Sequence, residues 1–234
     1  MTKIKTKLPK RVLQELDLLF AKLSDKTHEV RESALSRLMA YESQGTIPLE
    51  ALLAMLDEKN PVCVMYAISA LGRNQSPKAV KQLLALAKRY SKTMDVLMME
   101  NVVDALGTAK SKEGLPILLE IIGVSGFWKK VSGRLVVKKT TDEAQRFRDY
   151  LLLPVLRALE KIGDPRTGEA LGPLLDHDDS LVRWHTLKIL MAAGVKDYNA
   201  RIKEMAEKDP VQVVREAATI AMAKLSPLPE HLNN

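Results

Sequence analysis

A repeat of 31 to 35 residues constrains the fold of this sequence more than any other feature. Three segments each end one apolar-periodic stretch in Ala-Leu, pass through a glycine-containing turn and begin another such stretch; they start at Ile68, Val102 and Leu156. When Leu71, Leu106 and Leu159 are superposed, apolar residues coincide again twelve and fifteen residues later without a gap. Such self-similarity is typical of a solenoid, in which each unit buries its apolar face against its neighbours.

The stretch before each turn follows a stricter pattern, with apolar or small residues at offsets 0, 4, 7 and 8. These offsets lie on one stripe of a helix with 3.6 residues per turn. The six residues at offset 0 are Val30, Cys63, Met98, Leu151, Val182 and Val214. The interval between Met98 and Leu151 is 53 residues, which predicts an insertion of about 20 residues there.

The sequence predicts an all-α chain of about six two-helix repeats. The predicted first helices span 11–23, 48–57, 77–90, 113–122, 166–176 and 197–207. The predicted second helices span 27–42, 61–72, 94–107, 141–162, 180–193 and 211–225. Helix-forming residues dominate and aromatic residues make up only 4%, which favours helices over strands. We expect one domain over residues 1–234, with the insertion at about 124–141 in the fourth repeat.

Two motifs resemble those of HEAT repeats in the phycobilisome-lyase-like subclass. The D-x-x-x-x-V-R signature is approximated by Asp25…Val30-Arg31, Asp178…Val182-Arg183 and Asp209…Val214-Arg215. LEKIGDPRTGEAL resembles the Leu-Gly-x-Ile-Gly-Asp-Pro turn of the subclass, with Glu160 in place of the first glycine. The second to fourth repeats depart from the signature, because Val64, Met99 and Leu152 replace its arginine.

The resemblance covers nearly the whole chain and implies a right-handed α-α superhelix, a HEAT-like solenoid with an armadillo-like fold. It also implies structural roles for the signature residues: the aspartate caps the second helix and the arginine bridges adjacent repeats. The subclass includes pigment lyases, hydroxylases and adaptors, so it indicates a fold more than a function.

The second-helix face opposite the core stripe is the candidate binding surface, because it lines the concave side of HEAT-type solenoids. Large apolar residues alternate with glutamate at offset 2, and exposed apolar residues framed by charge are typical of a protein-binding groove. The candidate residues are Met65, Glu100, Asp104, Leu153, Arg157, Trp184 and Lys188. The alternative is a tighter curvature that buries Met65, Leu153 and Trp184. Offset 5 is almost uniformly apolar, and we assign it to packing between repeats.

The insertion supplies most of the net charge of +7 and contains no acidic residue. Its candidate binding residues are Phe127, Trp128, Lys129, Lys130, Arg134, Lys138 and Lys139. Apolar and polar residues alternate within the insertion, which suggests a short hairpin, although a disordered loop is equally consistent with the sequence. It could hold phosphate backbones or an acidic peptide, or it could be a solvated loop.

Evidence for catalysis is thin. The four histidines lack metal-ligand spacing, and the one His-Glu pair, His28-Glu29, is fewer than hydroxylases resembling deoxyhypusine hydroxylase need. Trp184, Arg183 and His185 faintly resemble the groove of HEAT-like DNA glycosylases, whose defining motifs are absent. Cys63 lies on a core stripe, where a buried thiol is expected. We predict no catalytic residue, metal site or cofactor.

These observations favour a non-catalytic adaptor that binds a protein or peptide partner. Nucleic-acid binding is the second hypothesis, and a pigment-lyase-like or glycosylase-like enzyme is the third. A single cysteine suits a reducing compartment. We find neither a signal-peptide core nor a run of about 20 apolar residues. We therefore expect a cytoplasmic protein with no membrane partner, and the oligomeric state stays open.

Overall fold

The computed structural model describes residues 9–43, 47–123 and 142–225, and all structural statements below concern these ranges. Within them the chain forms twelve α-helices that pair into six hairpins, as predicted. The first helices are α1 (Lys10–Lys22), α3 (Leu49–Met55), α5 (Pro77–Thr93), α7 (Leu115–Ile121), α9 (Arg166–Leu171) and α11 (Asn199–Lys208). The second helices are α2 (His28–Ser43), α4 (Pro61–Asn74), α6 (Val96–Thr108), α8 (Asp142–Ile162), α10 (Ser180–Ala193) and α12 (Gln212–Leu225).

Side-chain caps and prolines fix where several helices begin. Asn60 and Ser76 accept hydrogen bonds from backbone amides at the starts of α4 and α5, and each is followed by a proline in the first helical turn. Asp179 caps α10 by accepting from the amide of Leu181 at 2.8 Å. The cap is thus one residue later than Asp178, the residue expected from the signature. The positive φ of Gly194, 68°, ends α10.

Two predicted first helices are partly 3₁₀ helix, for the same physical reason. A 3₁₀ turn, η1 (Lys112–Gly114), precedes α7, and another, η2 (Gly172–Asp176), follows α9. Pro116 and Pro173 have no amide hydrogen to donate to the carbonyl four residues earlier, so regular α-helical bonding is interrupted at both places. Gly172 also packs against the ring of Tyr198, and a Cβ there would lie 1.8 Å from the Tyr198 Cζ atom.

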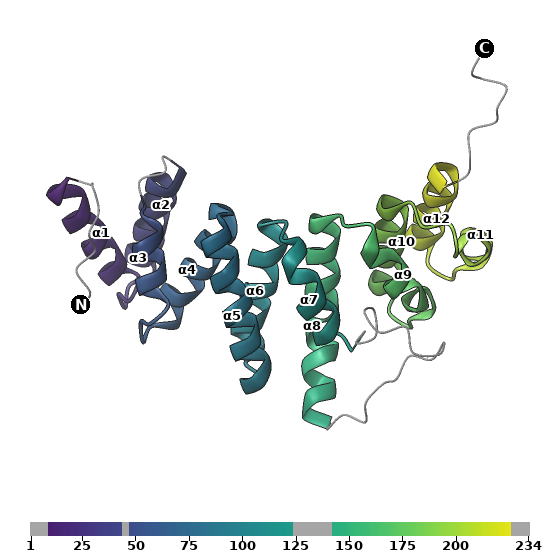
Figure 1. The fold of residues 1–234 in the computed structure, drawn as a ribbon, viewed down its shortest axis with the longest axis horizontal. Helices are drawn as coiled ribbons and strands as arrows, with labels where there is room; N and C mark the ends of the chain where they lie inside the picture. The colour runs from purple at the N-terminus through teal and green to yellow at the C-terminus, as the bar shows by residue number, and fades with distance from the viewer. Residues whose placement is uncertain (1–8, 44–46, 124–141, 226–234) are drawn as a thin grey trace, which may run out of the picture.

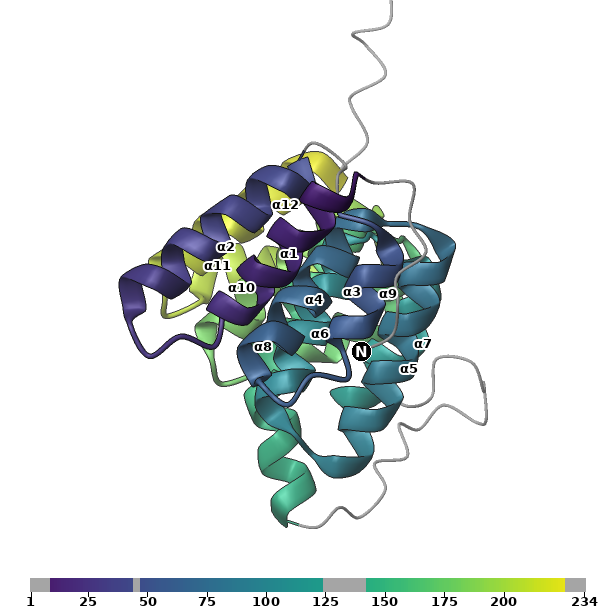
Figure 2. The ribbon, with the colours of Figure 1, turned by 90° about the vertical axis from the view of Figure 1, so that its left-hand side faces the viewer.

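The hairpins stack into one curved row. Figure 1 shows the row from α1 to α12, with both ends raised above its middle. Figure 2 looks along the row and shows α3, α5, α7 and α9 on one side, with α6, α8 and α10 on the other. In this view the terminal second helices, α2 and α12, lie toward the side of α6, α8 and α10. The terminal first helices, α1 and α11, are also displaced toward that side, so the ends of the row bend toward the second helices, which line the inside of the curve.

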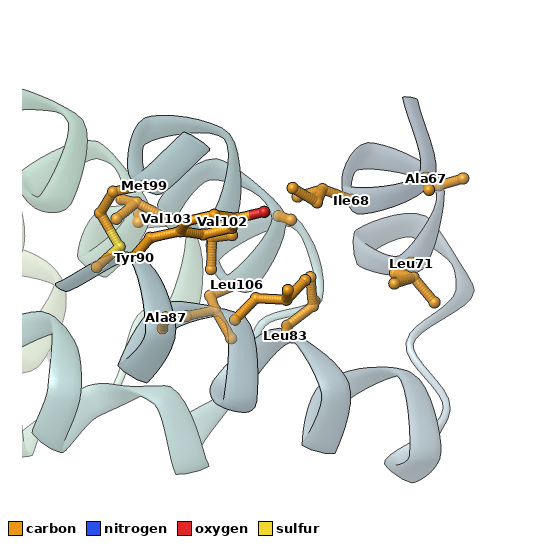
Figure 3. Close-up of a cluster of buried hydrophobic side chains, with 14 of the residues drawn as sticks. Ala67, Ile68, Leu71, Leu83, Ala87, Tyr90, Met99, Val102, Val103 and Leu106 are labelled. Carbon is orange, nitrogen blue, oxygen red and sulfur yellow. The ribbon is translucent and has the colours of Figure 1, made fainter. Parts of the chain in front are cut away.

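The apolar stripes of both helix layers meet between the layers and form the core. Figure 3 shows its central part, where Leu71, Leu83 and Leu106 are fully buried. Consecutive second helices also pack closely where residues are small. A Cβ added to Gly72 would lie 2.8 Å from Cα of Ala105, and one added to Gly107 would lie 2.8 Å from Cα of Ala158. These contacts bring α4 against α6 and α6 against α8.

The first hairpin is less closely joined to the stack. Offset 5 is buried between neighbouring second helices in α4, α6, α8 and α10, as expected; those residues are Ile68, Val103, Leu156 and Leu187. In α2 the equivalent Leu35 is 37% exposed, although Tyr66 and Arg73 of α4 donate hydrogen bonds to Glu42 of α2. A cavity of about 430 Å³ lies between α2 and α4, lined in part by Met39 and Leu52. Thr219, at the same offset in α12, is exposed because no repeat follows it among the described residues.

Candidate protein-binding site

A groove between α10 and α12 is the candidate site on the inner layer, and we call it the α10–α12 groove. It has a volume of about 250 Å³ and is lined by Trp184, Lys188, Met191, Val213, Glu216, Ala217 and Ile220. Most of its wall is apolar, yet Val213 is 49% and Ile220 54% exposed. Apolar side chains left in contact with water in a groove are a recurrent feature of protein-binding surfaces.

The groove exists because a large residue stands where the middle of the stack has glycine. Offset 9 of the second helix faces the next repeat, and it holds Gly72 in α4 and Gly107 in α6. In α10 this offset holds Met191, whose side chain lines the groove. A thioether side chain at this place prevents the close backbone approach that Gly72 and Gly107 permit. The inner edges of α10 and α12 therefore stay open.

A second feature of the site is a contact network centred on Glu160 of α8, which we call the Glu160 cluster. Its carboxylate is 3.0 Å from Nδ1 of His185 and also forms an ion pair with Lys188. The Lys188 ammonium lies 4.3 Å from the centroid of the Trp184 ring, within the range of a cation–π interaction. The His185 ring meets Trp184 edge-on, with centroids 4.8 Å apart.

The charges of the cluster favour the ionised form of Glu160. Partial burial alone would raise the pKa of this carboxyl group, but the hydrogen bonds from Lys188 and His185 outweigh it, so the pKa is lowered. The ionised carboxylate holds Lys188 and His185 in place. These two residues in turn contact the Trp184 ring, so the indole is held by its neighbours on α10 while remaining part of the groove wall.

The structure brings only two of the seven predicted groove residues, Trp184 and Lys188, into this groove. Leu153 is half-buried and packs against the main core cluster, which agrees with the burial alternative at that position. Met65 is half-buried on α4, two repeats earlier than Leu153, and Arg157 is exposed on α8. The predicted surface therefore does not form one continuous apolar row.

The two predicted acidic residues are tied to α8. Tyr150 donates a hydrogen bond to Glu100 at 3.1 Å, and Lys161 forms an ion pair with Asp104. These contacts connect α6 to α8 along the inner layer. They indicate that the acidic residues help to join neighbouring second helices.

The remaining predicted residues, Phe127 to Lys139 in the insertion at 124–141, lie outside the described residues. Five residues that line the groove are absent from the predicted site: Met191, Val213, Glu216, Ala217 and Ile220. One sequence signal could have indicated Met191: it stands at offset 9 of its helix, the offset at which the second and third repeats have Gly72 and Gly107.

Comparisons with known proteins agree with this architecture. Residues 139–223 match the family model described as HEAT repeats. The structure of the complex of CpcE and CpcF of phycocyanin lyase from Nostoc sp. PCC7120 matches with a TM-score of 0.52 and 20% identity, over 93% of this chain and 77% of that chain. The fold is a HEAT-repeat solenoid.

Two engineered structures also match this chain, each with a TM-score of 0.47. One is an engineered protein, 18% identical, matched over 90% of this chain and 96% of its own. The other is a designed armadillo repeat protein, 14% identical, matched over 90% of this chain and 100% of its own. A comparison with curated protein sequences finds no match.

The HEAT signature residues of the last two repeats form the expected structural bridge. Arg183 donates to both carboxylate oxygens of Asp209 at 2.9 Å, and it also bonds the backbone carbonyls of His177 and Asp178. Asp209 accepts from the amide of Val211 near the start of α12. The bridge thus joins the fifth HEAT repeat to the sixth, as the resemblance implies.

No group of three or more His, Cys, Asp or Glu side chains in the described ranges is placed to hold a metal ion. Among the same residues, no helix has the length and apolarity needed to cross a membrane.

Proposed function

We propose that this chain is a non-catalytic cytoplasmic scaffold that binds a segment of a partner protein in the α10–α12 groove. The observation that carries the proposal is an apolar, water-exposed groove with a tryptophan held in its wall. Tryptophan is enriched among residues that dominate binding energy, especially where apolar side chains surround it. Repeat solenoids commonly use their concave surface for such contacts.

The dimensions of the groove indicate the kind of segment that fits. Val213 and Ile220 are seven residues apart on α12, or about 10 Å along the helix axis. This length is about two helical turns, so it suits two apolar side chains seven residues apart on the apolar face of a short amphipathic helix. A cavity of about 250 Å³ accommodates small aliphatic anchors. We therefore expect the partner to insert aliphatic side chains between α10 and α12.

The Glu160 cluster supports the proposal through preorganisation. Side chains that become ordered only on binding lose about 0.5 to 1.5 kcal/mol each in conformational entropy. Trp184 and Lys188 already contact neighbours in the unbound chain. They have less conformational freedom left to lose when a partner docks.

The first test locates the contact and then measures it. A photo-crosslinking amino acid at Ile220, in the groove, should capture a partner in cells of the native organism, whereas the same residue at Leu97 should not. Leu97 is similarly exposed, at 52%, but lies at the start of α6 outside the groove. Mass spectrometry of the crosslink identifies the partner segment, whose affinity is then measured with purified proteins.

Trp184→Ala should weaken that segment's affinity by at least about 1 kcal/mol, roughly fivefold in dissociation constant. Leu97→Ala is the matched control and should leave the affinity unchanged. Circular dichroism would check that both variants keep the helical fold. Equal affinities for the wild type and a folded Trp184→Ala variant would remove the groove from the binding site.

A further inference from the structure

Helix α5 carries a basic face that the groove does not use. Its sequence, PKAVKQLLALAKRYSKT, contains no acidic residue. Five basic residues are exposed on it, and we call them the α5 basic stripe: Lys78, Lys81, Lys88, Arg89 and Lys92. None of them lies in the 124–141 insertion, to which the sequence analysis assigned most of the positive charge.

The stripe is straight and faces solvent. At 100° per residue, its five side chains fall within an arc of about 100°, and Lys78 and Lys92 are about 21 Å apart along the axis. The buried side chains of α5 point the opposite way, into the core; they are Ala79, Leu83, Leu86, Ala87 and Tyr90. Figure 1 places α5 near the middle of the row, in the outer layer of first helices.

Few carboxylates offset the charge of the stripe. Among the described residues, Lys78 alone of the five forms an ion pair, with Glu50 at 3.2 Å. Lys78 and Lys81 are three residues apart, and Lys88 and Lys92 are four apart, spacings at which like charges destabilise a helix. The basic residues near the C-terminus of α5 interact favourably with the helix dipole, whereas the positive charge of Lys78 in the first turn interacts unfavourably with it. Helix stability therefore does not account for the whole stripe.

We propose that the α5 basic stripe binds the sugar–phosphate backbone of nucleic acid. Phosphate contact is the form of macromolecular binding that cationic side chains can supply by themselves, through counterion release. A protein partner would need an apolar anchor, and an interfacial membrane helix would need exposed apolar residues. Between the basic residues of the stripe lies only the small Ala85, and the apolar face of α5 is buried.

The stripe is suited to binding that does not depend on base sequence. Four of the five stripe residues are lysines, which act as point charges and lack the planar fork of arginine; the exception is Arg89. Tyr90, the one aromatic residue of α5, is 8% exposed and offers no stacking platform. The affinity should therefore be similar for mixed sequences and steeply salt-dependent.

The test uses the full chain with two fluorescent probes, a DNA duplex and a single-stranded RNA of about 16 nucleotides or base pairs. Their affinities are measured by anisotropy between about 50 and 200 mM salt. Wild-type affinity should fall roughly a hundredfold across this range, as expected for about four neutralised phosphates. The triple variant Lys81→Gln, Lys88→Gln, Lys92→Gln should bind at least about tenfold more weakly at low salt, with a salt slope reduced by about 2 to 3.

A charge-matched control separates the stripe from net charge. Lys26→Gln, Lys196→Gln, Lys224→Gln also removes three exposed lysines, from other surfaces, and should bind like the wild type. Loss on the duplex alone or on the RNA alone would support the stripe and assign its natural ligand to that nucleic acid. Equal binding by the two triple variants overturns the proposal. So does stripe-dependent binding to an acidic peptide or to anionic vesicles without binding to either probe. The groove partner's affinity should be unchanged in both variants.

Discussion

Glu160 shows how one residue can affect both spacing and chemistry. It occupies offset 9 of α8, where α4 and α6 have glycine. In those helices the glycine allows the next helix to approach closely, whereas the Glu160 carboxylate points toward α10 and pairs with His185 and Lys188. The departure from the HEAT-type turn that was visible in the sequence therefore coincides with a polar cluster that joins α8 to α10.

Glu160→Gln should destabilise the chain by about 1 kcal/mol near neutral pH, because it removes the charge that Lys188 and His185 contact. The pKa of Glu160 is lowered, so its contribution is complete above the usual value of 4.5 and is lost as pH falls through the folded-state pKa. Urea unfolding of both proteins at neutral pH and in acid measures the difference. A difference that persists unchanged well below pH 4.5 would contradict this assignment.

The buried Arg183–Asp209 pair should matter more to stability than an exposed pair at the same junction. Its side chains are 8% and 4% exposed, so removing one charge leaves the other buried and unpaired. We expect Arg183→Met to cost about 3 kcal/mol or more. The matched control is Arg201→Met, which breaks the pair with Asp176, where the side chains are 37% and 68% exposed, and should cost about 1 kcal/mol or less. Urea unfolding measures both values, and equal losses would count against the bridge.

At the scale of helices, the spacing between neighbours depends on one small residue at each close junction. Gly72 and Gly107 let α4, α6 and α8 approach until backbone atoms are in contact. The next junction outward on each side carries a larger residue at offset 9, Met39 before the close pairs and Glu160 after them. The core stripe does not reveal this difference in helix spacing, because all these helices share the same stripe.

Gly72→Ala should lower the melting temperature even though alanine is the better helix former. The new Cβ would lie 2.8 Å from both Cα and the carbonyl oxygen of Ala105, so backbone must move, at a cost of about 1 to 3 kcal/mol. Gly114→Ala is the control, since its Cβ would meet the Leu106 side chain at 3.4 Å. Thermal unfolding by circular dichroism compares the two. A Gly72→Ala variant as stable as the wild type would mean that α4 and α6 can separate freely.

The sequence predicted the helices well because local signals agree at their ends. Asn60-Pro61 and Asp209-Pro210 mark helix starts within one or two residues of those observed. Pro116 and Pro173 were visible in the sequence, but the 3₁₀ turns beside them were not predicted. Those turns depend on which backbone carbonyl loses its hydrogen-bond donor. The cap at Asp179 was misplaced by one residue because three consecutive residues, His177 to Asp179, all have side chains that can accept a backbone amide.

The candidate binding surface was harder to predict than the helices, because its exposure depends on distances between repeats. Trp184 and Lys188 line the α10–α12 groove, yet Leu153, at the same offset as Trp184, packs against the core. Equivalent positions differ because each junction has its own spacing. The periodic pattern specifies direction from a helix axis, whereas exposure also depends on how near the next helix lies.

At the scale of the whole molecule, a row of hairpins makes stability local, since each repeat contacts only its neighbours. The first hairpin should open most readily, because the cavity of about 430 Å³ separates α2 from α4 and Met39 is 50% exposed. Hydrogen exchange followed by mass spectrometry should show faster exchange in α1 and α2 than in α4, α6 and α8. Protection of α2 equal to that of α6 would argue against a weak first junction.

The tight contacts at Gly72 and Gly107 also fix the length of the central part of the row. Openings lie on both sides of it, one between α2 and α4 and one between α10 and α12. Because α4, α6 and α8 are packed backbone to backbone and Glu160 joins α8 to α10 through His185 and Lys188, these two openings are held at a set separation. A ligand with two attachment points would gain avidity only if its linker spanned that separation. The rigid centre would then select bivalent ligands by the length of their linker.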